Sequence, residues 1–468
     1  MIWGIKSLMR FLPVVFFISI SITGCSTVSG VGDSVGRWMS GGEDNAEPPT
    51  PLVDIDSRVE IIKLWEKDIG IGTDKYYLKL SPAITQEMIF VADNDGNIKA
   101  INATNGNITW DQDIDESISG GPGTGDALVL VGTSEGEIIA LSSESGDTLW
   151  RTKVSSEILA TPKTANGIVI VRTIDGKIFG LSATAGTRLW IYDRTVPILT
   201  LRGTSAPVIY NNLIIAGFDG GRMAAIELET GKLIWETRIA LGSGRSELER
   251  MVDIDADPLI MDNIIYVATY QGRIAAVALD TGSILWTRDI SSYAGLCADD
   301  NNLYVTDDDS LIWALDRISG SSVWKQEKLK ARAATAPAII GDLIVVGDLE
   351  GYLHWMDKFN GQFVARTRVT DNLIIAPPNS INEILYTYAS DGTLGAYTYN
   401  TSEAIITTSQ TTDPDITVVE AEGSSENNQE QNVDDEKKDE EGFLDGLWGF
   451  FTSDDDEPSE PEASESNE

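Results

Sequence analysis

A glycine followed fourteen residues later by a tryptophan recurs along this chain at intervals of 38 to 51 residues. The pairs are Gly96/Trp110, Gly136/Trp150, Gly176/Trp190, Gly221/Trp235, Gly272/Trp286 and, with serine in place of glycine, Ser310/Trp324. Two further repeats start at Gly351 and Gly392. Strand-like repeats with a period of about 40 to 45 residues are typical of β-propellers, in which each repeat forms one blade.

The third repeat, residues 161–190, shows how one blade is expected to form. The apolar run Ile168–Val171 predicts a buried strand, and Ile178–Leu181 predicts its hairpin partner. Asp175-Gly176 and Ala185-Gly186 predict tight turns, because glycine adopts the positive φ that such turns require. An outer strand at Arg188–Trp190 and a short inner strand near Pro162 complete four strands.

Counting the repeats predicts an all-β, eight-bladed β-propeller of four-stranded blades over residues 59–400. The repeat at Gly392 lacks a tryptophan, and the strand-like segment Ile61–Trp65 supplies the missing outer strand. Pairing this N-terminal strand with the last blade closes the ring and protects two sheet edges. We interpret the repeated tryptophans as packing between neighbouring blades, in preference to a ligand-binding ring.

The first 24 residues have the pattern of a secretion signal. Lys6 and Arg10 precede an apolar stretch, Phe11–Ile22, that is too short to span a bilayer comfortably. The sequence then ends in Thr-Gly-Cys25, which resembles the lipobox of bacterial lipoproteins and implies cleavage before Cys25 and acylation of its thiol. The alternative is an ordinary cleavage site beside an incidental cysteine. In enterobacterial lipoproteins, which this pattern resembles, an Asp after the cysteine commonly signals retention in the inner membrane, so Ser26 implies the outer membrane. Residues 25–58 are interpreted as a flexible lipidated tether.

The other end of the chain, residues 401–468, is predicted to be an acidic disordered tail. From Glu420 to Glu468 it holds 19 Asp and Glu against two Lys, so it carries −17 of the net charge of −39. Within it, the cluster Phe443–Phe451 is either a docking motif or an unused apolar patch. Without the tail the net charge is still −22, which argues against binding to nucleic acid or to anionic headgroups.

Few residues offer chemistry for catalysis or metal binding. His354 is the only histidine and lies within a predicted strand, where a structural role is more common than a catalytic one. Cys297 has no partner if Cys25 is lipidated, and it reads as a small buried residue. Asp299-Asp300 and Asp307–Asp309 lack the spacing of a calcium loop and are interpreted as solvated turns. We therefore expect no catalytic residue, metal or cofactor.

The motif Thr-Gly-x-x-x-Trp, seen in Leu279–Trp286 and Leu228–Trp235, resembles the repeats of pyrroloquinoline quinone dehydrogenases. The same repeats occur in the family of outer-membrane β-barrel assembly lipoproteins (BamB), eight-bladed periplasmic propellers without a cofactor. The lipobox, the blade number and the segment Leu199–Pro207 together resemble that family, over roughly residues 55–400. The acidic tail departs from the family pattern.

The resemblance implies specific contact residues. In the family, the loop corresponding to Leu199–Pro207 contacts the insertase BamA, which implies roles for Leu199, Leu201 and Arg202. The matching segment Met251–Pro258 implies that Asp253 and Asp255 belong to the same surface. On the residues alone, two leucines and an arginine in a loop indicate an interface. The alternative is that both leucines fill the central channel while Arg202 pairs internally with Asp253 or Asp255.

The resulting hypothesis is a non-enzymatic scaffold, anchored by lipid at the periplasmic face of the outer membrane. It would dock on BamA within the wider assembly complex, contact unfolded outer-membrane proteins, and help to deliver, fold and insert them. A periplasmic propeller that binds a ligand or the cell wall is the first alternative. A quinone-dependent dehydrogenase is the second, and it would need a Ca²⁺ site and an aspartate base.

Overall fold

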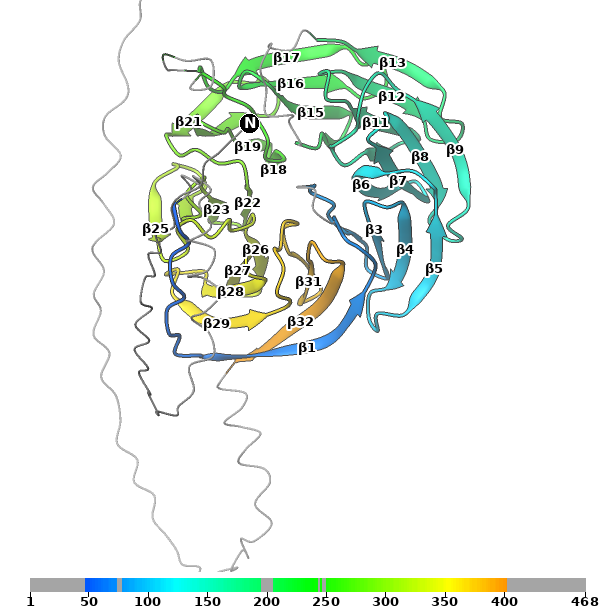
Figure 1. The fold of residues 1–468 in the computed structure, drawn as a ribbon. Coiled ribbons are helices and arrows are strands. Elements are labelled where there is room, and N and C mark those ends of the chain that lie inside the picture. Colours follow the sequence, from blue (N-terminus) through cyan, green and yellow to red (C-terminus); the bar gives the residue numbers. More distant parts are fainter. Residues whose placement is uncertain (1–46, 74–77, 195–204, 243–244, 246–249, 402–468) are drawn as a thin grey trace, which may run out of the picture. The chain divides into compact units, whose positions relative to one another are not determined.

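A computed structural model describes residues 47–73, 78–194, 205–242, 245 and 250–401. These residues form 32 β-strands arranged in eight four-stranded antiparallel sheets. Each sheet is one blade, and the blades follow one another around a ring (Figure 1). The prediction of an eight-bladed propeller is thereby confirmed. Over the described ranges, no helix is long and apolar enough to cross a membrane.

Blades 1 to 4 each take four consecutive strands, here termed A to D from the channel outward. Their bounds are β2 (Ala83–Ile84), β3 (Met88–Ala92), β4 (Asn97–Asn102) and β5 (Ile108–Asp113) in blade 1; β6 (Ile118–Gly125), β7 (Leu128–Thr133), β8 (Glu137–Ser142) and β9 (Thr148–Lys153) in blade 2; β10 (Lys163–Ala165), β11 (Ile168–Arg172), β12 (Ile178–Ser182) and β13 (Arg188–Tyr192) in blade 3; and β14 (Val208–Tyr210), β15 (Leu213–Phe218), β16 (Arg222–Glu227) and β17 (Leu233–Arg238) in blade 4.

Blades 5 to 7 repeat this order, and blade 8 joins the two ends of the described chain. The bounds are β18 (Leu259–Met261), β19 (Ile264–Ala268), β20 (Ile274–Ala278) and β21 (Ile284–Arg288) in blade 5; β22 (Gly295–Ala298), β23 (Asn302–Thr306), β24 (Ile312–Asp316) and β25 (Ser322–Gln326) in blade 6; β26 (Ala338–Ile340), β27 (Leu343–Gly347), β28 (Tyr352–Asp357) and β29 (Phe363–Arg368) in blade 7; and β30 (Asn379–Ile381), β31 (Ile384–Tyr388), β32 (Thr393–Thr401) and β1 (Val59–Asp68) in blade 8.

The N-terminal strand closes the ring as predicted. Strand β1 pairs antiparallel with β32 from Val59 opposite Thr401 to Asp68 opposite Thr393, and the two strands lie side by side in Figure 1. The order in this blade is therefore β30-β31-β32-β1, with the outer strand contributed by the opposite end of the chain.

Burial follows from the position of each strand in its blade. Every residue of β11 is buried, because a B strand is covered by neighbouring blades on both sides of its sheet. In the outer strand β13, Arg188, Leu189 and Ile191 are exposed, whereas Trp190 and Tyr192 are half-buried. The strand order also gives the ring two distinct faces. One carries the B–C turns and the D-to-A connections and is termed the loop face; the other carries the A–B and C–D turns and is termed the turn face.

The repeated tryptophan joins each blade to the next, as predicted. In blade 2, the Trp150 indole N–H donates to the carbonyl of Ala183 in blade 3 at 2.8 Å. Its ring lies over Gly186, where an added Cβ would come within 2.5 Å of the ring. The same two contacts, here called the tryptophan latch, join Trp65 to Ala103 and Gly106, Trp110 to Ser143 and Gly146, Trp190 to Leu228 and Gly231, Trp235 to Leu279 and Gly282, Trp286 to Arg317 and Gly320, and Trp324 to Lys358 and Gly361.

The junction between blades 7 and 8 is different. Each latch tryptophan sits on strand D opposite an alanine or glycine on strand C, as Trp150 does opposite Ala140. In blade 7 the two residues are exchanged, with Ala365 on β29 opposite Trp355 on β28. The physical reason is that blade 8 has no C–D turn, since its C and D strands come from opposite chain ends. Within the described part of blade 8, no C–D turn glycine supports a ring from β29, and Trp355 packs fully buried from the C strand instead.

Candidate partner-binding site

The predicted contact loop lies between blades 3 and 4, in the connection from β13 to β14 on the loop face. Leu199, Leu201 and Arg202 fall in residues 195–204, outside the described part of the chain. The residues that flank this segment are described, and they show how its two ends are held on the ring.

Both ends of the contact loop are held around Phe218, the last residue of β15. The guanidinium of Arg194, just before the segment, lies 5.0 Å from the Phe218 ring centre, and that of Arg172 lies 5.6 Å away. Arg172 donates to the carbonyl of Ser205, just after the segment, at 2.7 Å. Arg194 also donates to Glu236 at 3.1 Å. Cation–π contacts and charged hydrogen bonds of this kind fix the position of the loop ends.

These anchoring residues depart from the blade repeat. At the end of strand B, most blades carry Thr or Asp, whose side chain accepts N–H groups of the following turn, as Thr133 accepts from Glu137. Blade 4 carries Phe218 there instead. One residue earlier, where blade 3 has Arg172, blade 2 has the small residue Gly132. Arg172, Arg194 and Phe218 were not predicted from the sequence. A position-by-position comparison of the repeats singles out Arg172 and Phe218.

The second predicted segment, Met251–Pro258, contacts the residues that directly follow the undescribed part of the contact loop, Ser205 and Ala206. Asp253 and Asp255 are buried, with 1% and 8% of their surface exposed. Asp253 accepts the N–H of Gly220 at 3.0 Å, and its backbone forms an isolated bridge with Asp219. Asp257, in the same segment, accepts the N–H of Ala206 at 2.7 Å. The structure therefore brings Asp253 and Asp255 to the base of the contact loop.

The electrostatic feature of this base is an excess of buried carboxylate. Arg172 lies 3.8 Å from Asp219 in an ion pair, and burial lowers the pKa of Arg172. Burial, with a contribution from Asp253, raises the pKa of Asp255 to about 7. Burial likewise raises the pKa of Asp219. Among the described residues, neither Asp255 Oδ2 nor Asp219 Oδ1 has a hydrogen-bond partner. A cationic side chain placed here would be stabilised by both carboxylates.

His354, the residue considered for catalysis, lies within blade 7 and away from the base of the contact loop. Over the described part of the chain, no three His, Cys, Asp or Glu side chains are grouped as a metal site would require. His354 is fully buried, with Nε2 2.8 Å from Asp348 Oδ2 and Nδ1 accepting from Arg366. Burial lowers the pKa of His354, which keeps the ring neutral within blade 7.

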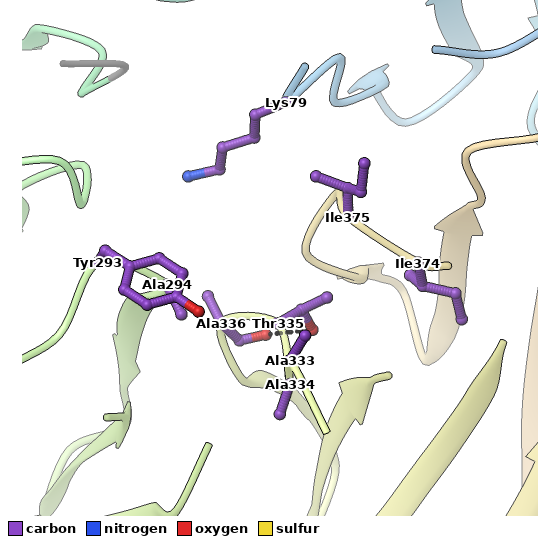
Figure 2. Close-up of a pocket in the computed structure, with 9 residues that line it drawn as sticks. All are labelled: Lys79, Tyr293, Ala294, Ala333, Ala334, Thr335, Ala336, Ile374 and Ile375. Carbon is purple, nitrogen blue, oxygen red and sulfur yellow. Dashed lines mark hydrogen bonds between the residues drawn. The ribbon is translucent and has the colours of Figure 1, made fainter. Parts of the chain in front are cut away.

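Two cavities open where the inner ends of the blades meet. One, of about 80 Å³, is shown in Figure 2 and is lined by Lys79, Tyr293, Ala334 and Ile374, among others. The other, of about 380 Å³, is lined by Lys79, Lys163 and Asp257, among others. Asp257, which lines the larger cavity, places it beside the base of the contact loop.

Comparison with known proteins gives a consistent result. Residues 94–326 match the family model described as outer membrane protein assembly factor BamB. The chain is 48% identical over 351 residues to the protein of that name from Pseudomonas aeruginosa, covering 75% of this chain and 92% of the relative. It is 50% identical over 345 residues to the one from Alkalilimnicola ehrlichii, covering 74% of this chain and 90% of the relative.

Solved structures show the same fold. The crystal structure of BamB from Moraxella catarrhalis matches with a TM-score of 0.67 and 28% identity, covering 72% of this chain and all of that one. A quinohemoprotein alcohol dehydrogenase from Comamonas testosteroni matches with a TM-score of 0.58 at 12% identity, covering 72% of this chain and 76% of the other. At that identity the likeness concerns the propeller fold alone.

Proposed function

The chain belongs to the BamB family of outer membrane protein assembly factors, and on that premise we propose that it is a non-enzymatic scaffold of the outer-membrane β-barrel assembly complex. It docks on the periplasmic part of the insertase BamA and assists the delivery, folding and insertion of outer-membrane proteins. The observation that carries the proposal is 48% identity over 92% of the length of a named assembly factor.

The contact loop supplies the proposed docking surface. Leu199, Leu201 and Arg202 make the contact, and Asp253 and Asp255 support the loop from below. A rigid ring suits this role, because a loop held at both ends loses little conformational entropy on binding. The fixed ends at Arg194 and Ser205 provide that restraint.

The docking surface is tested by a pull-down of the lipidated protein from outer membranes in mild detergent. Arg202→Glu is expected to lose the insertase complex while keeping the wild-type melting temperature. The matched control is Arg188→Glu, the same charge change on exposed β13 of blade 3 at the turn face. If Arg202→Glu retains the insertase complex, the interface does not include the contact loop. Absence of the insertase with the folded wild-type protein would reject the scaffold function.

We further propose that the protein is anchored by lipid on Cys25 at the periplasmic face of the outer membrane. Several acyl chains, at about 0.8 kcal/mol per buried CH₂, give durable anchoring. Cys25→Ser is expected to move the protein to the soluble periplasmic fraction, whereas Cys297→Ala, a substitution in β22, leaves it with the membrane. Membrane association of Cys25→Ser would contradict the anchor.

A further inference from the structure

The segment that precedes β1 runs across the outer edge of blade 7. At its C-terminal end, the N–H of Arg58 donates to the carbonyl of Val364 on β29 at 2.9 Å. Val364 is 4% exposed, whereas Leu149 and Leu189, at the same position in blades 2 and 3, are 54% and 52% exposed. The blade-7 edge is therefore covered where the equivalent edges of other blades are open. Figure 1 shows this segment in blue, running from β1 past β29 toward β25.

At its N-terminal end, the segment is fixed to the connection between blades 6 and 7. Thr50 donates both its N–H, at 3.1 Å, and its hydroxyl, at 2.8 Å, to the carbonyl of Lys330. The ammonium of Lys330 lies 2.9 Å from Glu47. Arg332 donates to the carbonyl of Thr50 at 2.9 Å. Three successive hydrogen bonds and an ion pair thus hold the segment.

Arg332 is itself part of a buried charge network in blade 7. Its side chain is 2% exposed and lies 2.7 Å from the fully buried Asp348, which also bonds His354. It contacts Glu350 as well. A guanidinium with three planar donor directions can hold two carboxylates and a backbone carbonyl at once. The Thr50 carbonyl therefore completes the hydrogen bonding of a buried cation, and this makes its position specific.

The two ends of the segment lie on opposite faces of the ring. Val59 pairs with Thr401 at the end of a C strand, which is the turn face. Lys330 and Arg332 belong to the D-to-A connection from β25 to β26, which is the loop face. Arg194 and Ser205, which flank residues 195–204, belong to the same type of connection, from β13 to β14, on the same face.

We propose that residues 47–58 form a strap that carries the membrane tether from the turn face to the loop face. The loop face, with the candidate partner-binding site, is thereby the one that the tether draws toward the bilayer. Without the strap, the chain would leave the ring at Val59 on the turn face. The free tether would also be longer by twelve residues, or up to about 40 Å of extended chain. The orientation rests on the lipid anchor proposed above; the strap itself does not.

The strap is tested by hydrogen exchange on the full-length lipidated protein. The Arg58 amide is expected to exchange at least about tenfold faster in the double variant Glu47→Lys/Thr50→Pro, which removes the ion pair and both Thr50 donors. Exchange in β12, far from the strap, stays unchanged. Both substitutions lie in the strap, so every residue of blade 7, including the buried Arg332–Asp348 pair, is unchanged. Fast exchange of Arg58 in the wild-type protein would overturn the strap.

The orientation is tested in phosphatidylethanolamine–phosphatidylglycerol vesicles that carry a headgroup quencher. Single fluorophores are attached at Glu135→Cys on the loop face or Glu144→Cys on the turn face, both exposed positions of blade 2. The background carries Cys297→Ala. Stronger quenching at position 135 is expected, and the double strap variant loses the difference. If the protein with the wild-type strap shows equal quenching at positions 135 and 144, or stronger quenching at position 144, the proposed orientation is wrong.

A separate outcome concerns the anchor. If neither the wild-type protein nor Cys25→Ser binds the vesicles, the lipid anchor fails and the orientation fails with it. The exchange experiment still decides whether the strap exists, because it requires no membrane.

Discussion

Seven of the eight blade junctions use the same latch, and the junction between blades 7 and 8 does not. At the seven, a ring from strand D covers a turn glycine of the next blade and donates to its backbone. At the eighth, Trp355 fills the space from strand C, and its Nε1 has no hydrogen-bond partner within the described residues. Even the closing junction, from Trp65 to Gly106, keeps the latch. The difference indicates that a latch requires a continuous C–D turn in the blade that receives the tryptophan ring, and blade 8 has no such turn.

The largest expected effects come from removing a tryptophan side chain, either from a latch or from the junction between blades 7 and 8. Trp355→Ala and Trp150→Ala should each lower the free energy of unfolding by about 3–5 kcal/mol. The loss should be larger for Trp355, which is completely buried, than for Trp150, which is 9% exposed. Trp190→Ala, in a half-buried latch, should lower the melting temperature less. Equilibrium denaturation measures all three, and an unchanged Trp190→Ala would contradict the blade register.

The junction between blades 3 and 4 adds a buried charge cluster to its latch, and this should make it sensitive to pH. The pKa of Asp255 is raised to about 7, above the value of about 3.9 in an unfolded chain. The folded protein therefore retains a proton that the unfolded chain releases, so stability falls as the pH rises from about 4 to 7 and then levels off. Asp255→Asn should stabilise the protein at pH 8 by on the order of 2–4 kcal/mol, with little effect at pH 4.

Denaturation of Asp255→Asn at both pH values measures this effect. Asp280→Asn, which removes an exposed carboxylate from blade 5, is the matched control and should change little at either pH. An Asp255→Asn effect that is equal at pH 4 and pH 8 would show that the carboxyl titrates normally.

A smaller effect is expected from substituting Gly186, the turn glycine beneath the Trp150 ring. Gly186 and Gly167 both have positive φ, of 65° and 75°. An added Cβ at Gly186 meets Trp150, whereas at Gly167 nothing lies within 4 Å. Gly186→Ala should therefore cost about 1–3 kcal/mol more than Gly167→Ala, because the backbone strain is common to both and the overlap is not. Equal losses of unfolding free energy in a denaturant titration would show that the contact between Gly186 and Trp150 does not contribute to the latch.

The smallest effect isolates the indole hydrogen bond. Trp150→Phe loses the bond to Ala183, whereas Trp355→Phe has no such bond to lose. The difference between the two unfolding free energies should be about 1 kcal/mol, with Trp150→Phe the more damaging. A reversed order would mean that Trp355 gains a polar contact in solution.

Sequence alone predicted the regular part of this molecule because that part is local. Turn glycines, apolar strands and the tryptophan recur within about 40 residues, so each blade can be recognised by itself. The exchange of Trp355 and Ala365 was missed because its cause, the absent turn in blade 8, lies in the other chain end. The strap was missed for the same reason, since Thr50 and Lys330 are 280 residues apart.

The candidate site was predictable only in part. Asp253 and Asp255 were chosen from a family resemblance, and they lie together at the base of the contact loop. Arg172 and Phe218 were missed because each looks ordinary within its own strand. Their meaning comes from a contact between two blades, which a pattern along one strand does not contain.

The pairing of β1 with β32 also sets an order of events. Of the 32 described strands, β1 is synthesised first and β32 last, so the closing blade cannot form until all eight repeats have been synthesised. Until then, both β1 and the growing chain end expose unpaired strand edges that can aggregate. A ring that closes through its first strand is therefore most prone to aggregation while the chain is incomplete, and correct folding depends on completing synthesis before those edges pair with other chains.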